Sequence, residues 1–393
     1  MPRWAACFRG ECFVFHPVPR EQFDEVFRQV ERWGLDQYIG EHAYEKLTYS
    51  VSGRGRAAGS YGSLGDLIKE EEEMIMNPVN RLGLALMLSV FAAAAAAQTY
   101  GFSTLPPGTI LHAQASVIAK VVQDHSKLQL RVIGFGGDVG ILDSVEQKKS
   151  DFMVLDIGET ADSYEGVGTW KGKPHKNLRN AIQMYGFQMG PFVRKDSPYQ
   201  TVADLKGKRV PSGWAQQTGN LPHTIAVLAT GGITYNDVVR VPAVNVVRGA
   251  DDFKAGKLDM FPFAVGAPKV AEVAASVGGL RYLGFAKDQE PLMKKVRQEY
   301  YLSTVNPAPH IAGIDKPTLV QTIDVVITVG AHVKDEVVYE FVKAMRTNKK
   351  ELAEGHPNFN RFDPDDAGKI QPRLPFHPGA IKYFKEAGIW RGK

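Results

Sequence analysis

Residues 76–97 have the composition of a secretory signal peptide, although they lie well inside the chain. A short segment with positive charge only, ending at Arg81, is followed by the apolar run Leu82–Phe91 and an alanine run that offers several A-x-A cleavage positions before Gln98. The apolar and alanine runs together are shorter than the roughly 20 residues of a bilayer-spanning helix. The sequence therefore predicts export, with cleavage near Ala97 and a folded protein from Gln98 onward. An uncleaved membrane anchor or a buried helix is the alternative.

The 75 residues upstream of this segment are interpreted as over-extended translation. Glu70–Glu73 stands just before Met74 and Met76, as a translated ribosome-binding sequence ahead of a start codon would. The alternative is a real N-terminal domain, because apolar residues recur at helical spacing within 20–34. A core of that size would be marginally stable alone.

Charge and cysteine content narrow the kinds of function expected. From Gln98 onward, 37 Lys and Arg face 30 Asp and Glu. This mild, scattered excess does not favour nucleic-acid binding but suits an anionic small ligand. Cys7 and Cys12 both precede Gln98, so no disulfide or thiol chemistry is expected in the folded part. The histidines form no close metal-binding pair and no nucleophile elbow is present, so neither a metal, a cofactor nor a catalytic centre is expected.

The chain from Gln98 alternates short β-branched runs with amphipathic helices, the pattern of a parallel α/β sheet. Phe152–Asp156 is a predicted strand, 181–195 is predicted to be extended, and 321–329 is a long apolar strand that returns to the first part of the fold. We expect one lobe from 98–190 plus 320–393 and a second lobe from 191–319. Two α/β lobes interrupted in this way predict a hinged protein with a ligand cleft between them.

The glycine-rich loop 134–140 is the first candidate binding loop. It follows a predicted strand and begins a helix, so the backbone amides of Gly136, Gly137, Asp138 and Val139 are expected to bind an anion. The alternative is a tight turn whose glycines only permit the fold. The loop also imitates a dinucleotide-binding unit with Asp156 as its acid, but its glycine spacing misses the motif by one residue.

Two further loops follow predicted strands of the second lobe. The loop 211–220 offers amides and hydroxyls beside an aromatic wall, and its candidate ligand-binding residues are Trp214, Gln217, Thr218, Gly219 and Asn220. The alternative is a surface loop with a packed tryptophan. The loop 264–268, with Gly266, is expected to line the same face.

Several segments in the same order resemble one known family. Leu205–Val210, Phe263–Pro268, Val337–Val342 and Pro375–Ala380 resemble the TAXI-type solute receptors of TRAP transporters, and the resemblance covers nearly all of 99–390. It implies a type II periplasmic-binding-protein-like fold and a non-enzymatic, periplasmic receptor. Such a receptor delivers a small carboxylate, such as glutamate or a related amino acid or dicarboxylate, to a membrane permease driven by an ion gradient. An exported enzyme or a sensor receptor on the same scaffold is the alternative.

The family's binding loops map onto Thr218-Gly219-Asn220 and onto Gly136-Gly137, but this sequence departs from the family pattern. Leu221 stands where an arginine is usual, Asp156 where a glutamine is usual, and Gly158 where an acidic or amide residue is usual. An anionic Asp156 in the cleft would disfavour a plain dicarboxylate. The hypothesis is that the ligand carries a positive group, as an amino acid does, or that a bound cation intervenes. The alternative is that Asp156 pairs with a lysine or arginine of the scaffold.

Overall fold

The computed structural model describes residues 5–8, 11–14 and 98–392, and the chain divides into two units, 1–93 and 94–393. In the first unit, β1 (Ala5–Phe8) and β2 (Glu11–Val14) pair antiparallel. The predicted signal peptide 76–97 and the amphipathic segment 20–34 lie outside the described residues. No helix within the described ranges is both long enough and apolar enough to cross a membrane.

The second unit is built on an eight-stranded sheet with the order β10-β6-β12-β5-β3-β4, in which β11 also pairs with β12 and β9 with β6. A separate two-stranded sheet joins β7 and β8. The strands are β3 (Thr99–Thr104), β4 (Gln129–Gly134), β5 (Phe152–Asp156), β6 (Leu178–Arg194), β7 (Arg209–Gly213), β8 (Val239–Ala243), β9 (Phe261–Ala264), β10 (Leu280–Tyr282), β11 (Tyr301–Val305) and β12 (Thr318–Gly330).

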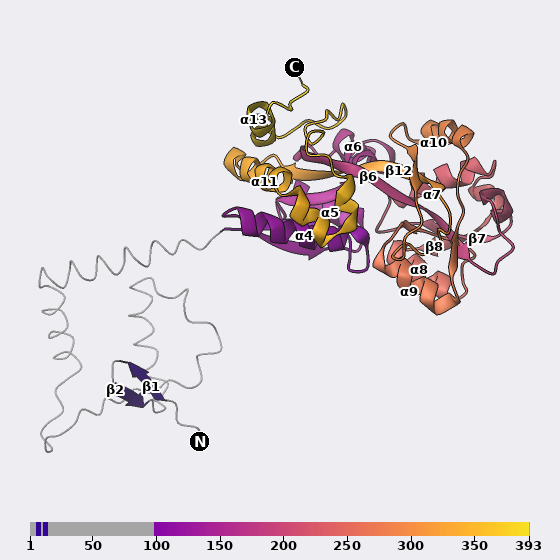
Figure 1. Cartoon of the computed structure of the whole chain (residues 1–393), viewed down its shortest axis with the longest axis horizontal. Helices are drawn as coiled ribbons and strands as arrows, with labels where there is room; N and C mark the ends of the chain where they lie inside the picture. Colours follow the sequence, from indigo (N-terminus) through magenta and orange to yellow (C-terminus); the bar gives the residue numbers. More distant parts are fainter. Residues whose placement is uncertain (1–4, 9–10, 15–97, 393) are drawn as a thin grey trace, which may run out of the picture. The chain divides into compact units, whose positions relative to one another are not determined.

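Helices pack around these strands in two α/β lobes (Figure 1). The first lobe holds α4 (Ile110–His125), α5 (Asp138–Glu146), α6 (Ile157–Glu165), α11 (Asp335–Thr347), α12 (Lys349–Gly355) and α13 (Pro378–Glu386). The second lobe holds α7 (Asn220–Thr230), α8 (Val246–Lys254), α9 (Pro268–Val277) and α10 (Glu290–Val296). The helix α11, which follows β12, lies beside α4, so both ends of this unit build the first lobe.

The long strands β6 and β12 run through both lobes and join them. Both are almost continuously buried, as expected of strands covered on both faces. Residue 190 lies inside β6 and residue 320 inside β12, so the lobe limits proposed from the sequence both fall within strands of the hinge. The division of the chain at these residues stays a prediction.

The expectation of a parallel sheet is only partly correct. β3 pairs parallel with β4 and β5, and β7 pairs parallel with β8. β12 pairs antiparallel with both β5 and β6, because it carries the chain back from the second lobe beside the strand that left the first. The sheet is therefore mixed.

Aromatic side chains hold the C-terminal helices on the first lobe. Phe341 of α11 stacks on Phe152 of β5 with ring centroids 4.5 Å apart, and it contacts Phe102 of β3 edge to face. All three rings are fully buried. This packing anchors the amino end of β5, and Asp156 stands at the opposite end of the same strand.

Candidate ligand-binding site

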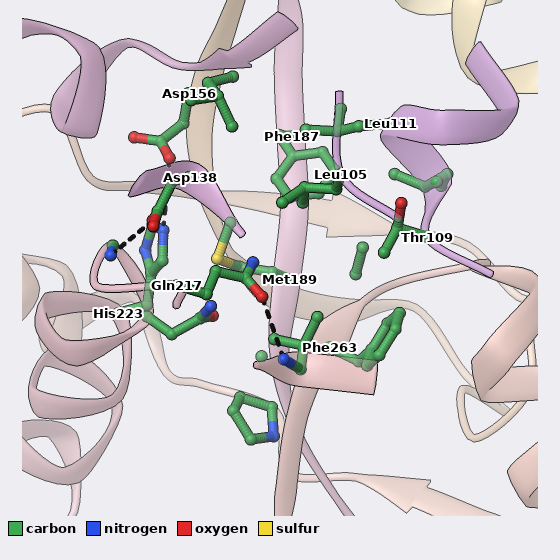
Figure 2. A pocket seen from close by; sticks show the side chains of 18 of the residues that line it. Leu105, Thr109, Leu111, Asp138, Asp156, Phe187, Met189, Gln217, His223 and Phe263 are labelled. Atoms are coloured by element: carbon green, nitrogen blue, oxygen red, sulfur yellow. Dashed lines mark hydrogen bonds and ion pairs between the residues drawn. The ribbon is translucent and has the colours of Figure 1, made fainter. Parts of the chain in front are cut away.

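A cavity of about 50 Å³ lies between the two lobes, which is space for about three to five water-sized groups. Both lobes and both hinge strands contribute to its wall, which consists of Leu105, Thr109, Ile110, Leu111, Asp138, Leu155, Asp156, Phe187, Met189, Gly190, Gln217, Gly219, Asn220, His223, Val246, Pro262, Phe263, Ala264 and Gln321. Figure 2 shows Asp138, Asp156 and His223 at one end of the cavity and apolar side chains, among them Leu111 and Phe263, at the other. The cavity therefore has an ionisable end and an apolar end.

One carboxylate of the protein bridges the two lobes beside this cavity. Asp138, at the start of α5 in the first lobe, accepts hydrogen bonds from the backbone amides of Thr218 at 2.9 Å and Gly219 at 2.7 Å in the second lobe. The Asp138 side chain is almost fully buried. We call this arrangement the Asp138 bridge. The backbone amides of Thr218 and Gly219 were candidates for binding a ligand carboxylate, but here they bind a carboxylate of the protein itself.

Glycine is required on the second-lobe side of the bridge. A Cβ atom at Gly219 would lie 2.7 Å from Oδ2 of Asp138. A Cβ at Gly137, on the first-lobe side, would overlap the backbone of Gln216. The loops 134–140 and 211–220 thus approach each other so closely that side chains at Gly137 and Gly219 have no room.

Further hydrogen bonds connect the two lobes. The side-chain amide of Asn245 donates to the carbonyl of Gly136 at 2.8 Å. In addition, the amide of Lys269 donates to the carbonyl of Gly108 at 3.2 Å. The structure is therefore that of a closed two-lobe protein.

The predicted binding residues fall into three groups. Five line the cavity: Asp138, Asp156, Gln217, Gly219 and Asn220. Four stand outside its wall, where the two lobes contact each other: Gly136, Gly137, Val139 and Thr218. The remaining two, Trp214 and Gly266, do not line it.

The expectation that Trp214 forms a wall of the cleft is wrong. Its side chain is fully buried in the core of the second lobe, and its indole N–H lies 3.4 Å from the hydroxyl of Tyr235. Trp214 adopts a left-handed backbone conformation (φ 51°), which turns the loop. Gly266 also has a positive φ (77°), consistent with a turn. Trp214 and Gly266 therefore contribute to the conformation of their loops and not to the cavity wall.

Asp156 is partnered by scaffold residues of both lobes. Its Oδ1 caps α6 by accepting from the amide of Glu159 at 2.9 Å, and it lies 3.6 Å from a guanidinium nitrogen of Arg297. Its Oδ2 lies 3.6 Å from Nε2 of His223. Burial works to raise the pKa of Asp156, but His223 and Arg297 together outweigh it and hold the pKa below its usual value. Asp156 therefore pairs with an arginine of the scaffold, which was the alternative to a role in ligand binding.

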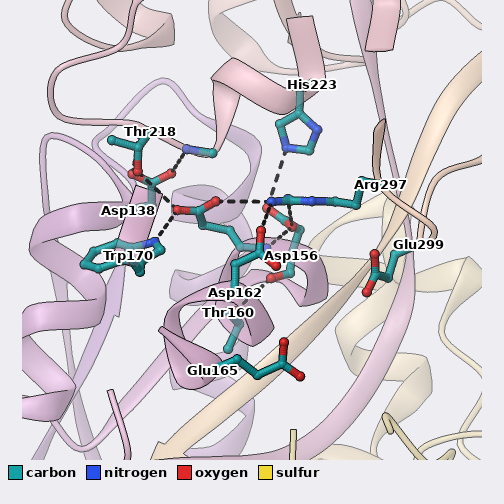
Figure 3. A network of polar contacts seen from close by, with 12 residues as sticks. Asp138, Asp156, Thr160, Asp162, Glu165, Trp170, Thr218, His223, Arg297 and Glu299 are labelled. Atoms are coloured by element: carbon teal, nitrogen blue, oxygen red, sulfur yellow. Dashed lines mark hydrogen bonds and ion pairs between the residues drawn. The ribbon is translucent and has the colours of Figure 1, made fainter. Parts of the chain in front are cut away.

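Arg297 is the centre of a charge cluster that also joins the lobes (Figure 3). It follows α10 in the second lobe and reaches three acids of the first lobe, with Asp162 at 2.6 Å, Glu159 at 3.5 Å and Asp156 at 3.6 Å. Gly158 leaves room for it, because a Cβ there would lie 2.5 Å from the Arg297 side chain. A glycine at 158, where the TAXI-type receptors that the sequence resembles have an acidic or amide residue, thus has a steric explanation.

Glu159 connects this cluster to the Asp138 bridge. Its carboxylate accepts from the indole of Trp170 at 2.7 Å and from the hydroxyl of Thr218 at 3.1 Å. Burial, and then the charge of Glu159, raises the pKa of Asp138 well above its usual value, against the opposing hydrogen bonds from the loop amides. Burial likewise raises the pKa of Glu159. Burial is thus the main cause of both shifts, and the neighbouring carboxylates add to it.

His223 and Gln321 are cavity residues that the sequence reasoning missed. The hydroxyl of Tyr300 lies 2.6 Å from Nδ1 of His223, and Nε2 of the same ring lies 3.6 Å from Oδ2 of Asp156. Burial lowers the pKa of His223. Gln321 interrupts the apolar run of β12, and a polar residue at such a position was the available signal. Arg297 gave no comparable signal, because its partners are far away in sequence.

A Ser–His–Asp chain also occurs in the first lobe. Nδ1 of His175 lies 2.9 Å from the hydroxyl of Ser163, and its Nε2 lies 2.9 Å from Asp143. Ser163 is fully buried within α6, so a substrate has no access to its hydroxyl. The described part of the chain contains no group of three or more His, Cys, Asp and Glu side chains placed to hold a metal ion.

A cavity enclosed by two α/β lobes on a pair of shared hinge strands defines the class of bilobed ligand-binding proteins. The chain belongs to the NMT1-like family, whose model matches residues 103–388. A solved structure described as a periplasmic transporter aligns with a TM-score of 0.50 at 14% identity, covering 75% of this chain and 94% of that chain. The ligand-binding component of an ABC-type import system from Staphylococcus aureus aligns with a TM-score of 0.46 at 11% identity, covering 75% and 94%. The predicted type II periplasmic-binding-protein-like fold is confirmed.

Proposed function

We propose that this protein is a non-enzymatic solute receptor of the periplasm, which captures a small molecule between its lobes and delivers it to a membrane permease. The observation that supports this most is the enclosed cavity between two hinged lobes, tied shut by the Asp138 bridge. Closure around a ligand gives a permease one defined arrangement of both lobes to recognise. Membership of the NMT1-like family and the likeness to a periplasmic transporter support the same function.

We further propose that the permease is of the TRAP type and that the receptor is of the TAXI type. The order of the matching segments along 99–390 supports this choice. The ligand proposed from the sequence is a small carboxylate such as glutamate or a related amino acid. The side-chain amide of Asn220 lines the cavity and is able to donate to a carboxylate.

The test of this function is identification of the ligand that the protein retains. We expect mass spectrometry of the natively purified full chain to reveal a small organic molecule, released on denaturation. We expect solution scattering to show that the emptied protein becomes more compact when that molecule is returned. An absence of both a retained molecule and any compaction by a cell extract would refute the receptor function. Chemical conversion of the returned molecule would instead support the enzyme alternative.

A further inference from the structure

The charges around the cavity identify the chemical class of its ligand. Asp138 and Asp156 line one end of the cavity, and Glu159 lies directly behind them. The residues of the cavity wall include no lysine or arginine. The nearest buried cation, Arg297, stands outside that wall and is already shared among three acids. Acidic groups therefore outnumber the described cations at the ionisable end of the cavity.

A second, independent observation concerns Gln321 on the hinge strand β12. Its side chain is fully buried and lines the cavity, and its Oε1 has no hydrogen-bond partner within the described structure. Its Nε2 lies 3.4 Å from the carbonyl of His223. A buried acceptor without a donor is costly, so the site lacks a hydrogen-bond donor that a ligand is able to supply.

The remaining wall limits the size and shape of this ligand. Leu105, Leu111, Phe187 and Phe263 lie away from the ionisable end (Figure 2), and the cavity accommodates only a few non-hydrogen atoms. A compact apolar body with one donor-rich head fits these conditions. Glutamate, with a second carboxylate on a longer side chain, fits them poorly.

We propose that the ligand carries a protonated amine, held at the Asp138–Asp156 end of the cavity and donating to Oε1 of Gln321, on a small and mainly apolar body. Short amino acids and short aliphatic amines form this class. The proposal rests on the receptor function and specifies its substrate. An ammonium group supplies both the positive charge and the hydrogen-bond donors that the site lacks.

The experiment compares compounds that differ only at the amine. The emptied full chain is titrated by calorimetry with alanine, lactate and propionate, with ethylamine and ethanol, and with the other amino acids against their hydroxy or keto analogues. We expect at least one amine to bind about tenfold or more tightly than its amine-free partner, the factor for one charge-assisted hydrogen bond. Binding of no amine, or a smaller preference than this in every pair, overturns the proposal. The receptor function is read separately, from the retained molecule and from compaction.

Gln321→Leu tests the position of the amine. We expect it to reduce the preference for alanine over propionate about tenfold while the melting temperature stays the same or rises, because an unpaired buried acceptor is removed. A general disturbance of the site would weaken both compounds equally, and an unchanged preference or an equal loss overturns the assignment. Gln200→Leu, at an exposed position of the second lobe outside the cavity, is the matched control.

Discussion

The Asp138 bridge makes a prediction about closure that needs no ligand. Asp138→Asn keeps the size of the side chain but replaces one acceptor oxygen by an NH₂ group, which then faces the amide of Thr218 or Gly219. Each hydrogen bond from an amide to a carboxylate contributes about 1.5–3 kcal/mol. Loss of one of the two should therefore shift the closed-to-open ratio roughly 10- to 150-fold toward the open form. The lower end is expected, because the asparagine no longer has a charge to desolvate.

Hydrogen exchange of the loop amides is the direct measurement. The amides of Thr218 and Gly219 donate to Asp138, so a peptide spanning 214–222 should exchange slowly in the wild-type protein and faster in Asp138→Asn by about the same factor. Asp124→Asn is the control, because Asp124 pairs only with Lys120 on the surface of α4. Equal exchange in wild type and Asp138→Asn, with an unchanged radius of gyration, would refute the idea that this carboxylate holds the lobes together.

Three other perturbations follow from the same region. Gly219→Ala should oppose closure by about 1–3 kcal/mol and expand the protein in solution scattering, whereas Gly249→Ala, where the added methyl has ordinary room, should not. Arg297→Met should lower the free energy of unfolding by about 3–5 kcal/mol in urea titrations, because it leaves several acids without their buried cation, and Lys294→Met on the surface should change it by less than about 1 kcal/mol. The lowered pKa of His223 means that the folded protein binds fewer protons than the unfolded chain, so this residue's contribution is present above about pH 6.5 and is lost as the pH falls below it. His223→Gln should flatten the loss of stability measured by thermal melting between pH 7 and 5, and an identical slope in both proteins would contradict that assignment.

The elements that depend on local patterns were predictable from the sequence. Phe152–Asp156 forms the strand β5 as expected, since an apolar run bounded by polar residues requires no distant information. The α4 helix buries Leu111, Ala115 and Ile118, which recur at helical spacing. The antiparallel direction of β12 was not predictable, because strand periodicity is the same in both directions.

The candidate site was predictable only in outline. The loops around Gly137 and Gly219 were chosen for their backbone amides and glycines, and the structure brings these loops together. The chosen chemistry was incomplete, because a helix N-terminus that is able to bind an anion does not reveal whether the anion is a ligand or a side chain of the same protein. Asp138 is that side chain here. Its role depends on lobe packing, which no local pattern encodes.

Two of the differences between this sequence and the TAXI-type receptors that it resembles change the charge in the same sense. Leu221 stands where the TAXI-type receptors that the sequence resembles have an arginine, and Asp156 stands where they have a glutamine. The structure places Leu221 against the apolar core and Asp156 in the cavity wall, with Arg297 neutralising Asp156 only from behind that wall. Both differences make the protein more negative than those receptors, and Asp156 does so within the cavity wall, which supports the proposed ammonium group over a dianion. A double substitution, Leu221→Arg with Asp156→Gln, should accordingly shift the preference measured by calorimetry from amines toward their keto-acid partners, and more strongly than either substitution alone. Retention of the amine preference by the double variant would show that neither position determines the charge of the ligand.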